Sequence, residues 1–466
     1  MEVRLGLLLA ALGSVAASSP EQVHLSFGDT EEKVGLPLGN LPAAMTLRES
    51  WGLQRILGRV RAADDPRELV VVWSTQDDPS PQVVEYGTDP GQLDQRANAS
   101  RRILMNGIIV RRRQILHRAA MTGLVPATRY WYRVGENVTG WSRTFNVRTL
   151  PDTPDFSPRV AVYGDLGYEN ARSVPRLISE VEADNFDFIL HIGDFAYDLN
   201  SIQGKVGDRF FSMIEPMAAH VPYMVAAGNH ELFWNFTNYK TRFDMPNTDD
   251  NLMYSFKAGP ALFLIISTEV YYFLELGGAE AIIRQYRWLE KQLEEANQPE
   301  NRSRWPWIFI LGHRPMYCSN NNIRDCGWDQ NRIRVGIPLV NAFGLEGLLY
   351  KYGVDVAFWA HQHSYERMLP LYSSRIYIGS LESPYTNPRA TVHITTGSAG
   401  CKERVDYFRQ RQPPWSAFRS SDYGYSRMTI HNSTHLYLEQ VSDDQGGLVT
   451  DKVWIIQENH GTFINR

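Results

Sequence analysis

Two short apolar runs that each end in Gly-Asp constrain the fold of this chain more than any other feature. They cover residues 160–165 and 188–194, and apolar residues at positions 174, 177, 178 and 181 between them follow the spacing of an amphipathic helix. This order predicts a β-α-β unit. Because its two parallel strands end at the same edge of a sheet, Asp165, Asp194 and the nearby Tyr197 are expected to face one small space.

Length and charge limit the classes of protein to which the chain can belong. Its 466 residues are too many for one ordinary core and predict two or more domains. The 47 basic and 52 acidic side chains give a net charge of −5. This balance gives no support for a nucleic-acid partner bound through bulk charge, and we expect none.

The N-terminus has the pattern of a secretory signal. A short start with Arg4 precedes an apolar run at 5–17 that ends in small residues, so we expect residues 1–17 to be removed. The competing interpretation is a buried N-terminal helix. No later apolar run approaches the roughly 18 residues of a membrane helix, so no membrane partner is expected. Five sequons agree with a secreted or lumenal, N-glycosylated product; they are Asn98, Asn137, Asn235, Asn301 and Asn432.

The chain has three cysteines. Cys318 and Cys326 lie eight positions apart in a polar loop, and an oxidising compartment would allow them to pair. Cys401 would then remain as a thiol, most simply a buried structural one. The sequence alone leaves the pairing open.

The first part of the chain is rich in strand and turn signals. Residues 18–36 show no periodicity and are expected to form a loose arm. Further along, Tyr130, Tyr132 and Val134 alternate behind a turn, as in the tyrosine corner of a fibronectin type III-like sandwich. We therefore predict an arm and an all-β sandwich within 18–150.

The second part alternates strands and helices. Two prolines in the segment 151–156 indicate a linker, and an α/β domain of β-α-β-α-β order is predicted at 157–466. A long helix is expected within this domain at about 279–296.

Donor side chains follow five of the predicted strand ends. Besides the two Gly-Asp runs, these ends lie after residues 227, 311 and 359, and the seven donors are Asp165, Asp194, Tyr197, Asn229, His313, His361 and His363. Seven donors are too many for one four-coordinate zinc ion but suit two ions that share a carboxylate. Hard oxygens mixed with imidazoles fit iron, zinc or manganese and exclude a thiolate site.

Each of these signals taken singly has a simpler structural explanation. A Gly-Asp after a strand is usually a turn, and a single histidine at a strand end is more often a hydrogen-bonded structural residue. His361 and His363, separated by one residue, direct both rings to one side of an extended segment, which favours metal binding. Five such signals in succession favour a dinuclear metal centre.

The motifs at these strand ends resemble the signature blocks of the purple acid phosphatases, in their long, plant-like form, within the metallophosphoesterase superfamily. The blocks are Gly164-Asp165, Gly193-Asp194-x-x-Tyr197, Gly228-Asn229-His230-Glu231, His313 and His361-x-His363. The resemblance spans most of residues 37–460 and implies a metallophosphoesterase domain after the sandwich.

The resemblance also implies a ligand for each ion. Asp165, Tyr197 and His363 would hold a ferric ion, with charge transfer from the phenolate giving a purple colour. A second divalent ion, zinc or iron, would be held by Asn229, His313 and His361, and Asp194 would bridge the two.

The implied activity is acid phosphatase action on small phosphate monoesters, by attack of metal-bound hydroxide on phosphorus. Two such ions, less two carboxylates and a phenolate, leave a charge of about +2 that attracts a phosphate dianion. His230 is placed to hydrogen-bond phosphate or the leaving oxygen. Arg314 or Arg324 would either clamp phosphate or lie on the solvated surface.

Two departures from the family pattern bear on this expectation. Ala360 stands where the last block usually has glycine, which costs little unless that position needs positive φ. The loop at 317–326 contains no histidine, although family members often carry one or two there. The leaving-group acid is therefore open between His230, Asp325 and a water.

Two other functions compete with a monoesterase. One is a related metallophosphoesterase that acts on phosphodiesters or nucleotides, which faster turnover of diesters than of monoesters would favour. The other is a secreted binding protein with an idle metal site and the sandwich as its working surface. The sequence does not fix the oligomeric state.

Overall fold

The computed structural model describes residues 20–28, 67–76, 81–109, 111–153, 155–322, 326, 331–337 and 340–464. The expected signal peptide at 1–17 lies outside the described residues, and so do Arg324 and Asp325. Within the described part of the chain, no helix is long and apolar enough to cross a membrane.

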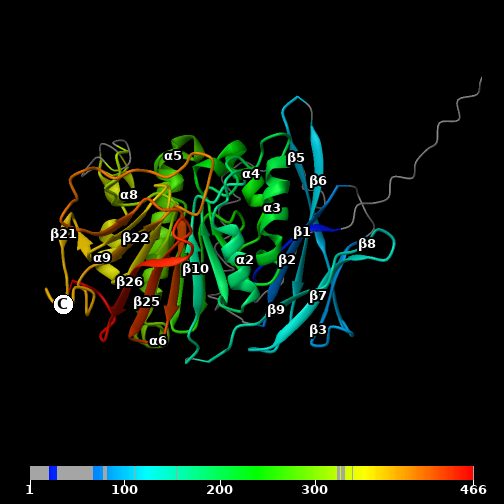
Figure 1. The fold of residues 1–466 in the computed structure, drawn as a ribbon, viewed down its shortest axis with the longest axis horizontal. Coiled ribbons are helices and arrows are strands. Elements are labelled where there is room, and N and C mark those ends of the chain that lie inside the picture. The colour runs from blue at the N-terminus through cyan, green and yellow to red at the C-terminus, as the bar shows by residue number, and fades with distance from the viewer. Residues whose placement is uncertain are drawn as a thin grey trace, which may run out of the picture.

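A sandwich of two antiparallel sheets forms one end of the molecule, drawn in blue and cyan in Figure 1. The first sheet runs β1 (Glu21–Phe27), β2 (Leu69–Thr75), β6 (Arg112–Met121), β5 (Ser100–Asn106). The second runs β4 (Gln95–Asn98), β3 (Val83–Gly87), β7 (Arg129–Glu136), β8 (Gly140–Trp141), and β9 (Phe145–Arg148) also pairs with β7. The hydroxyl of Tyr130 accepts a hydrogen bond from Val125 N at 3.0 Å, which is the expected tyrosine corner.

The expectation of a loose arm at 18–36 is wrong for residues 21–27, which form strand β1; residues 18–19 and 29–36 lie outside the described residues. Val23 and Leu25 point into the sandwich core, whereas His24 and Ser26 bond to the backbone of residues 242 and 244 in the neighbouring domain. This alternation with period two is a strand signal, and it makes β1 part of the contact between the two domains.

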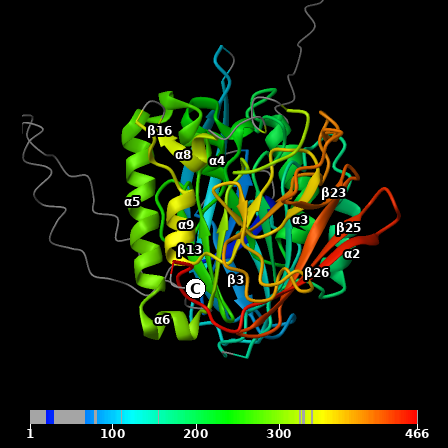
Figure 2. The same ribbon diagram turned by 90° about the vertical axis from the view of Figure 1, so that its left-hand side faces the viewer.

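The rest of the chain forms two sheets that pack face to face, with helices outside them (Figures 1 and 2). The six-stranded sheet runs β12 (Tyr223–Ala226), β11 (Phe188–Ile192), β10 (Arg159–Tyr163), β24 (Gly424–Ile430), β25 (His435–Ser442), β26 (Leu448–Ile456). The seven-stranded sheet runs β13 (Tyr254–Ala258), β14 (Ala261–Ile265), β15 (Trp307–Leu311), β18 (Val356–Trp359), β22 (Val392–Thr396), β19 (Tyr365–Met368), β23 (Ser416–Ser420). Short ribbons pair β16 (Gly336–Ile337) with β17 (Ala342–Phe343), and β20 (Leu371–Tyr372) with β21 (Arg375–Ile376).

Helices cover the outer faces of both sheets. They are α2 (Val174–Glu182), α3 (Lys205–Ala218), α4 (Phe233–Arg242), α5 (Gly278–Ala296), α6 (Pro299–Arg304), α8 (Arg332–Val335) and α9 (Glu346–Tyr352). Three-residue turns of 3₁₀ helix are η1 (Asn229–Glu231), η2 (Glu269–Tyr271) and η3 (Leu274–Leu276). The predicted β-α-β unit is β10-α2-β11, with its strands parallel, and the predicted long helix is α5; both predictions are confirmed.

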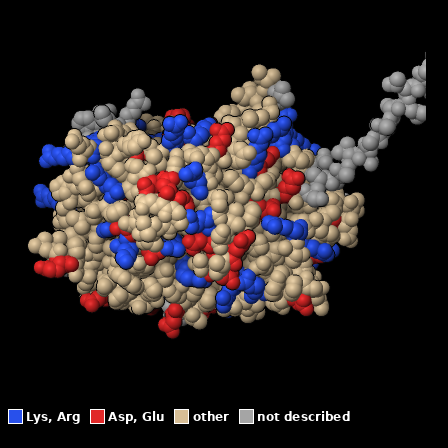
Figure 3. Space-filling model, viewed as in Figure 1, with Lys and Arg blue, Asp and Glu red and all other residues tan. Residues whose placement is uncertain are grey.

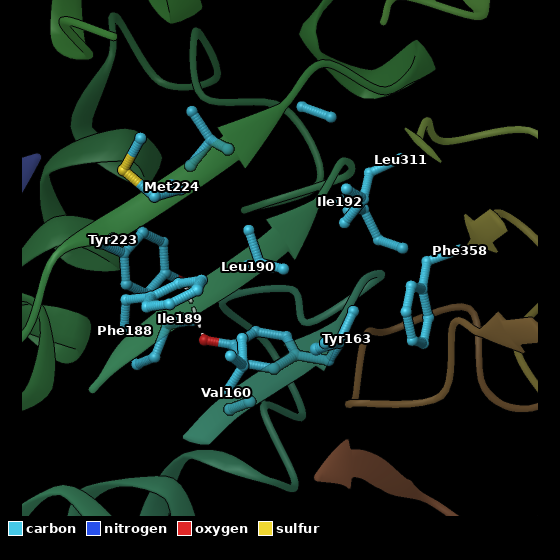
Figure 4. Packing of buried hydrophobic residues seen from close by; sticks show 14 of the residues in the cluster. Val160, Tyr163, Phe188, Ile189, Leu190, Ile192, Tyr223, Met224, Leu311 and Phe358 are labelled. Carbon is cyan, nitrogen blue, oxygen red and sulfur yellow. Dashed lines mark hydrogen bonds between the residues drawn. The ribbon is translucent and has the colours of Figure 1, made fainter. Parts of the chain in front are cut away.

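Large apolar side chains hold the two sheets together. Phe188 in β11 meets Phe263 in β14 with ring centroids 5.5 Å apart, and Figure 4 shows the surrounding residues of the core. In β15, Phe309 faces this inter-sheet core while Ile308 packs against α5. Strands buried on both faces explain why the sequence shows continuous apolar runs rather than alternation. On the face drawn in Figure 3, acidic and basic side chains are interspersed.

Gly164 and Ala360 meet where the ends of β10 and β18 approach each other. A Cβ atom on Gly164 would lie 2.4 Å from the Cβ of Ala360. Ala360 is fully buried, and the positive φ that a glycine would favour belongs instead to His361, at 67°. The departure at Ala360 is therefore tolerated, as expected, because its methyl group uses the space that Gly164 leaves.

We predict that Gly164→Ala destabilises the protein by about 1–3 kcal/mol because two methyl groups would overlap. Adding Ala360→Gly should recover most of this loss, because only one of the two methyl groups then remains. Recovery should be incomplete, because the new Cβ at position 164 would still lie 3.2 Å from the carbonyl oxygen of Ile192. Urea unfolding of the two single variants and the double variant measures the coupling. Strictly additive effects would contradict this account of the packing.

A second prediction concerns stability in acid. His393 in β22 is buried, and its Nδ1 accepts a hydrogen bond from Trp359 Nε1 at 3.1 Å. Burial, helped by the charge of Arg334, lowers the pKa of His393 from 6.5 to about 3. Because the folded pKa lies below the unfolded one, this contribution to stability is complete above pH 6.5 and declines as the pH falls towards 3.

At pH 4.5 the loss from this one residue should be about 3 kcal/mol relative to pH 7. His393→Gln should therefore flatten the dependence of the unfolding free energy on pH between 4.5 and 6.5. The exposed His431, changed to Gln, is the matched control. If the unfolding free energy of His393→Gln depended on pH as steeply as that of the wild type, the His393 imidazole would not be buried in its neutral form.

Candidate metal centre

Five strand ends from the two sheets converge on one site. Strands β10, β11 and β12 are parallel neighbours in the six-stranded sheet and carry Asp165, Asp194 and Asn229 just beyond their ends. Strands β15 and β18, parallel neighbours in the other sheet, carry His313 and His361. The sequence predicted this edge, but not that it is shared between two sheets.

The first group of donor atoms is a tight triangle formed by Asp165, Tyr197 and His363. The Tyr197 hydroxyl lies 3.2 Å from Asp165 Oδ1 and 2.8 Å from His363 Nε2. The distance between His363 Nε2 and Asp165 Oδ1 is 3.5 Å. Ligand atoms about 2.1 Å from one metal ion are themselves about 3 Å apart, so this triangle has the size of a coordination face.

The second group contains Asp194, His313 and His361. Asp194 Oδ2 lies 3.1 Å from His313 Nε2, and one ligand atom from each of the three residues lies within 4.8 Å of the others. Asn229 joins the group through Arg314, whose guanidinium bonds both Asn229 Oδ1, at 3.0 Å, and His361 Nε2, at 2.7 Å. All seven residues singled out in the sequence therefore lie around one site.

The histidines are oriented as metal ligands would be. Nδ1 of His313 lies 3.0 Å from the carbonyl of Ile192, and Nδ1 of His363 lies 2.7 Å from the carbonyl of Arg404. Each Nδ1 is thus within hydrogen-bonding distance of a backbone carbonyl, which directs Nε2 towards the site, as in histidines that bind metal ions. His313 Nε2 is buried and makes no hydrogen bond. An unsatisfied buried nitrogen beside a carboxylate fits a cation at this position.

Burial and charge shift the pKa values of the donor groups. Burial, together with the charges of Asp165 and Asp194, raises the pKa of Tyr197 well above its usual 10. Such a phenol loses its proton only in the presence of a strong positive charge, which a bound metal ion supplies. Burial raises the pKa of Asp194, but the neighbouring imidazoles of His313 and His230 and the backbone N–H of His230 outweigh it and lower this pKa below its usual value.

The backbone is strained at these residues. Asp165, Asp194, Tyr197 and His361 all have φ between 53° and 67°. A left-handed conformation costs a non-glycine residue about 1–2 kcal/mol, so the surroundings must impose it. The carboxylates help, because Asp165 Oδ2 accepts from His361 N at 2.8 Å and Asp194 Oδ1 accepts from His230 N at 2.9 Å.

Glu231 is a supporting residue whose role was not predicted from the sequence. Its buried carboxylate accepts from the backbone N–H groups of Gly228 at 2.9 Å, Asp194 at 2.9 Å and Phe195 at 3.0 Å. These hydrogen bonds connect the loop that follows β11 to the loop that follows β12. The signal that was available is a glutamate three residues after Gly228, the spacing at which its carboxylate can accept from the backbone N–H at the start of a helical turn.

His230 lies at the rim of the site. Its ring centroid is 4.4 Å from that of Tyr197, and its Nδ1 is 2.9 Å from Asp198 Oδ1. Burial works against the imidazolium, but the bond to Asp198 and the charges of Asp194 and Glu231 raise the pKa of His230 to about 9. The side chain is therefore a hydrogen-bond donor that faces partly into solvent.

Arg314 does not lie on the solvated surface, which was one of the two roles expected for it. Its Nε donates to both oxygens of Glu269, at 3.1 and 2.9 Å, and Glu269 is fully buried. The guanidinium carbon lies 4.5 Å from the ring centre of Tyr272. Glu269 was not anticipated either, although a single acid between the apolar runs at 261–266 and 270–273 was a visible signal.

The loop after His313 is closed by a disulfide between Cys318 and Cys326, which is the pairing that the sequence allowed but left open. Cys401 is a buried free thiol. Cys401 Sγ lies 3.3 Å from Nδ1 and 4.0 Å from Nε2 of His363. Two side chains of this loop have structural partners: Ser319 bonds Glu366, and Asn320 bonds Ser364.

Three family models match successive parts of the chain. They are described as "Purple acid Phosphatase, N-terminal domain" at residues 59–149, "Calcineurin-like phosphoesterase" at 158–365, and "Iron/zinc purple acid phosphatase-like protein C" at 390–452.

Similar proteins and structures give the same assignment. Acid phosphatase type 7 of Mus musculus is 47% identical over 394 residues, covering 84% of this chain and 89% of that protein. Its Homo sapiens counterpart is 46% identical over 422 residues, which cover 88% of this chain and 95% of that protein. The purple acid phosphatase PPD1 from yellow lupin seeds has the same fold, with a TM-score of 0.72 at 23% identity over 94% of this chain and 75% of that one. The chain belongs to the purple acid phosphatase family.

Proposed function

We propose that this chain is a secreted, N-glycosylated acid phosphatase that hydrolyses small phosphate monoesters with a ferric ion and a second divalent ion, zinc or iron. The observation that carries the proposal is the grouping of seven oxygen and nitrogen donors into two adjoining clusters, which the bond from His361 N to Asp165 joins. The family consists of dinuclear metal enzymes, and the relatives at 46–47% identity are named acid phosphatases.

The donor set fits two different ions. Asp165, Tyr197 and His363 would hold the ferric ion, because a phenolate and a carboxylate suit a hard trivalent cation. Asn229, His313 and His361 would hold the divalent ion, and Asp194 would bridge. When bound, the two ions polarise a phosphate ester and lower the pKa of water.

The residues of this chain would bind phosphate and move a proton. His230 projects over Tyr197, and its bond to Asp198 keeps it protonated and oriented. We assign it the role of donor to the leaving oxygen, because it lies beside Tyr197 at the rim of the site, is partly exposed and carries a proton there.

Secretion and glycosylation rest on the sequence and on exposure. Four of the five sequon asparagines are exposed, Asn98, Asn137, Asn235 and Asn432, and Asn301 is half-buried. These positions are compatible with N-linked sugars in a folded chain.

The test of the proposed function is a visible spectrum recorded with metal analysis and an aryl phosphatase assay between pH 4 and 8. We expect two ions per chain, a visible charge-transfer band and an acid optimum. Tyr197→Phe should abolish the band, because no phenolate would remain on the ferric ion. Tyr163→Phe, which removes a buried hydroxyl bonded to Tyr223 at 3.0 Å, should keep it.

A colourless wild-type protein that is active near neutral pH would contradict the ferric assignment and indicate another metallophosphoesterase. Faster hydrolysis of diesters than of monoesters would favour the diesterase alternative. A protein that binds no metal and is inactive at every pH would support the binding-protein alternative.

A further prediction separates His230 from the metal ligands. His230→Ala should slow hydrolysis of an alkyl phosphate about 10²–10⁴-fold, as expected for loss of a general acid. Hydrolysis of p-nitrophenyl phosphate should slow much less, because its leaving group needs no proton. Asp198→Asn should show a smaller effect of the same kind, with metal content unchanged. Equal losses on both substrates would exclude His230 as the proton donor.

A further inference from the structure

A buried guanidinium lies against two of the residues proposed to hold the second ion. Arg314 Nη1 is 2.7 Å from His361 Nε2, and Nη2 is 3.0 Å from Asn229 Oδ1. Because a guanidinium has donors and no acceptor, the nitrogen and the amide oxygen must accept these bonds with their lone pairs.

The guanidinium is held in place from its other side. Nε bonds both oxygens of Glu269, the backbone N–H of Arg314 donates to Thr268 Oγ1 at 2.9 Å, and the ring of Tyr272 lies 4.5 Å away. The side chains of Arg314 and Glu269 are 9% and 0% exposed. The pair is therefore neutral as a unit and restrained in its orientation.

A divalent ion needs the same two lone pairs. It would bind His361 Nε2 and Asn229 Oδ1 at about 2.0–2.2 Å, where an N–H hydrogen now points. The ion and the N–H groups exclude each other, and the two positive charges repel. In the first cluster, by contrast, the Tyr197 hydroxyl lies within hydrogen-bonding distance of Asp165 and His363, which are themselves expected ligands.

We propose that Arg314 is a built-in competitor that sets how strongly the second metal ion binds. This inference rests on the proposed dinuclear function. When the second ion enters, the terminal nitrogens of Arg314 leave His361 and Asn229 while Nε stays on Glu269. The first ion then binds more tightly than the second, and activity follows the free concentration of the divalent metal.

The experiment compares zinc binding to the second site in wild type and Arg314→Met. The full-length protein, purified with its iron, is equilibrated at buffered free zinc concentrations, and bound zinc per chain is counted by elemental analysis. Methionine has a similar reach and no donor, so half-occupancy should occur at a free zinc concentration at least tenfold lower than in wild type. This is the size expected for two lost hydrogen bonds.

Removing Arg314 alone also leaves a bare buried carboxylate, which would attract zinc by charge. The double variant Arg314→Met/Glu269→Gln removes both charges and keeps the net charge of the wild type. It should retain most of the gain in affinity, and it remains informative if the single variant fails to fold. Arg332→Met is the matched control, because Arg332 also lies over Tyr272, at 5.6 Å. It should bind zinc as the wild type does.

Several outcomes would overturn the inference. Superimposable zinc curves for wild type and Arg314→Met, with two ions bound in each, would refute competition while leaving the proposed function intact. A gain in the single variant that vanishes in the double variant would mean that the charge of Glu269 acts, not displacement of Arg314. Failure of every variant and the wild type to bind any ion would remove the dinuclear site, and this inference with it.

Discussion

The face-to-face packing of two β-sheets holds the candidate metal ligands in place. Asp165 and Asp194 extend from the six-stranded sheet, whereas His313 and His361 extend from the seven-stranded one. The triangle of Asp165, Tyr197 and His363 therefore exists only while the aromatic core between the sheets keeps them in register. Close packing makes such a core resist small displacements, which is why it can hold donor atoms at fixed separations.

The same carboxylates that are candidates for metal binding also hold the strained backbone. One oxygen of Asp165 meets Tyr197 and the other accepts the N–H of His361, and one oxygen of Asp194 meets His313 while the other accepts the N–H of His230. Conformational strain of this kind persists only where the surroundings over-determine it. Hydrogen bonds within the chain therefore hold the loops at the site in place before a metal ion binds. Binding of the ion then costs less conformational entropy.

The sequence predicted the elements whose signals are local. Apolar runs ending in donor residues indicated the strand ends, and helical periodicity indicated α2 and α5. What was not predicted depends on tertiary contacts. Strand β1 has a weak alternation that becomes a strand only against β2 and α3, and the convergence of two sheets has no local signature. Glu231 and Glu269 are single acids that each have a distant partner, Phe195 at 36 positions and Arg314 at 45 positions.

We infer that two metal ions lie side by side at this edge, one on Tyr197 and the other on Asn229. Anomalous diffraction from crystals of the full chain, recorded on either side of the iron and zinc absorption edges, would locate them. We expect two peaks about 3.5–4 Å apart, with the iron peak nearest the Tyr197 oxygen and Asp194 between the two. A single peak, or two peaks that do not flank Asp194, would contradict this inference.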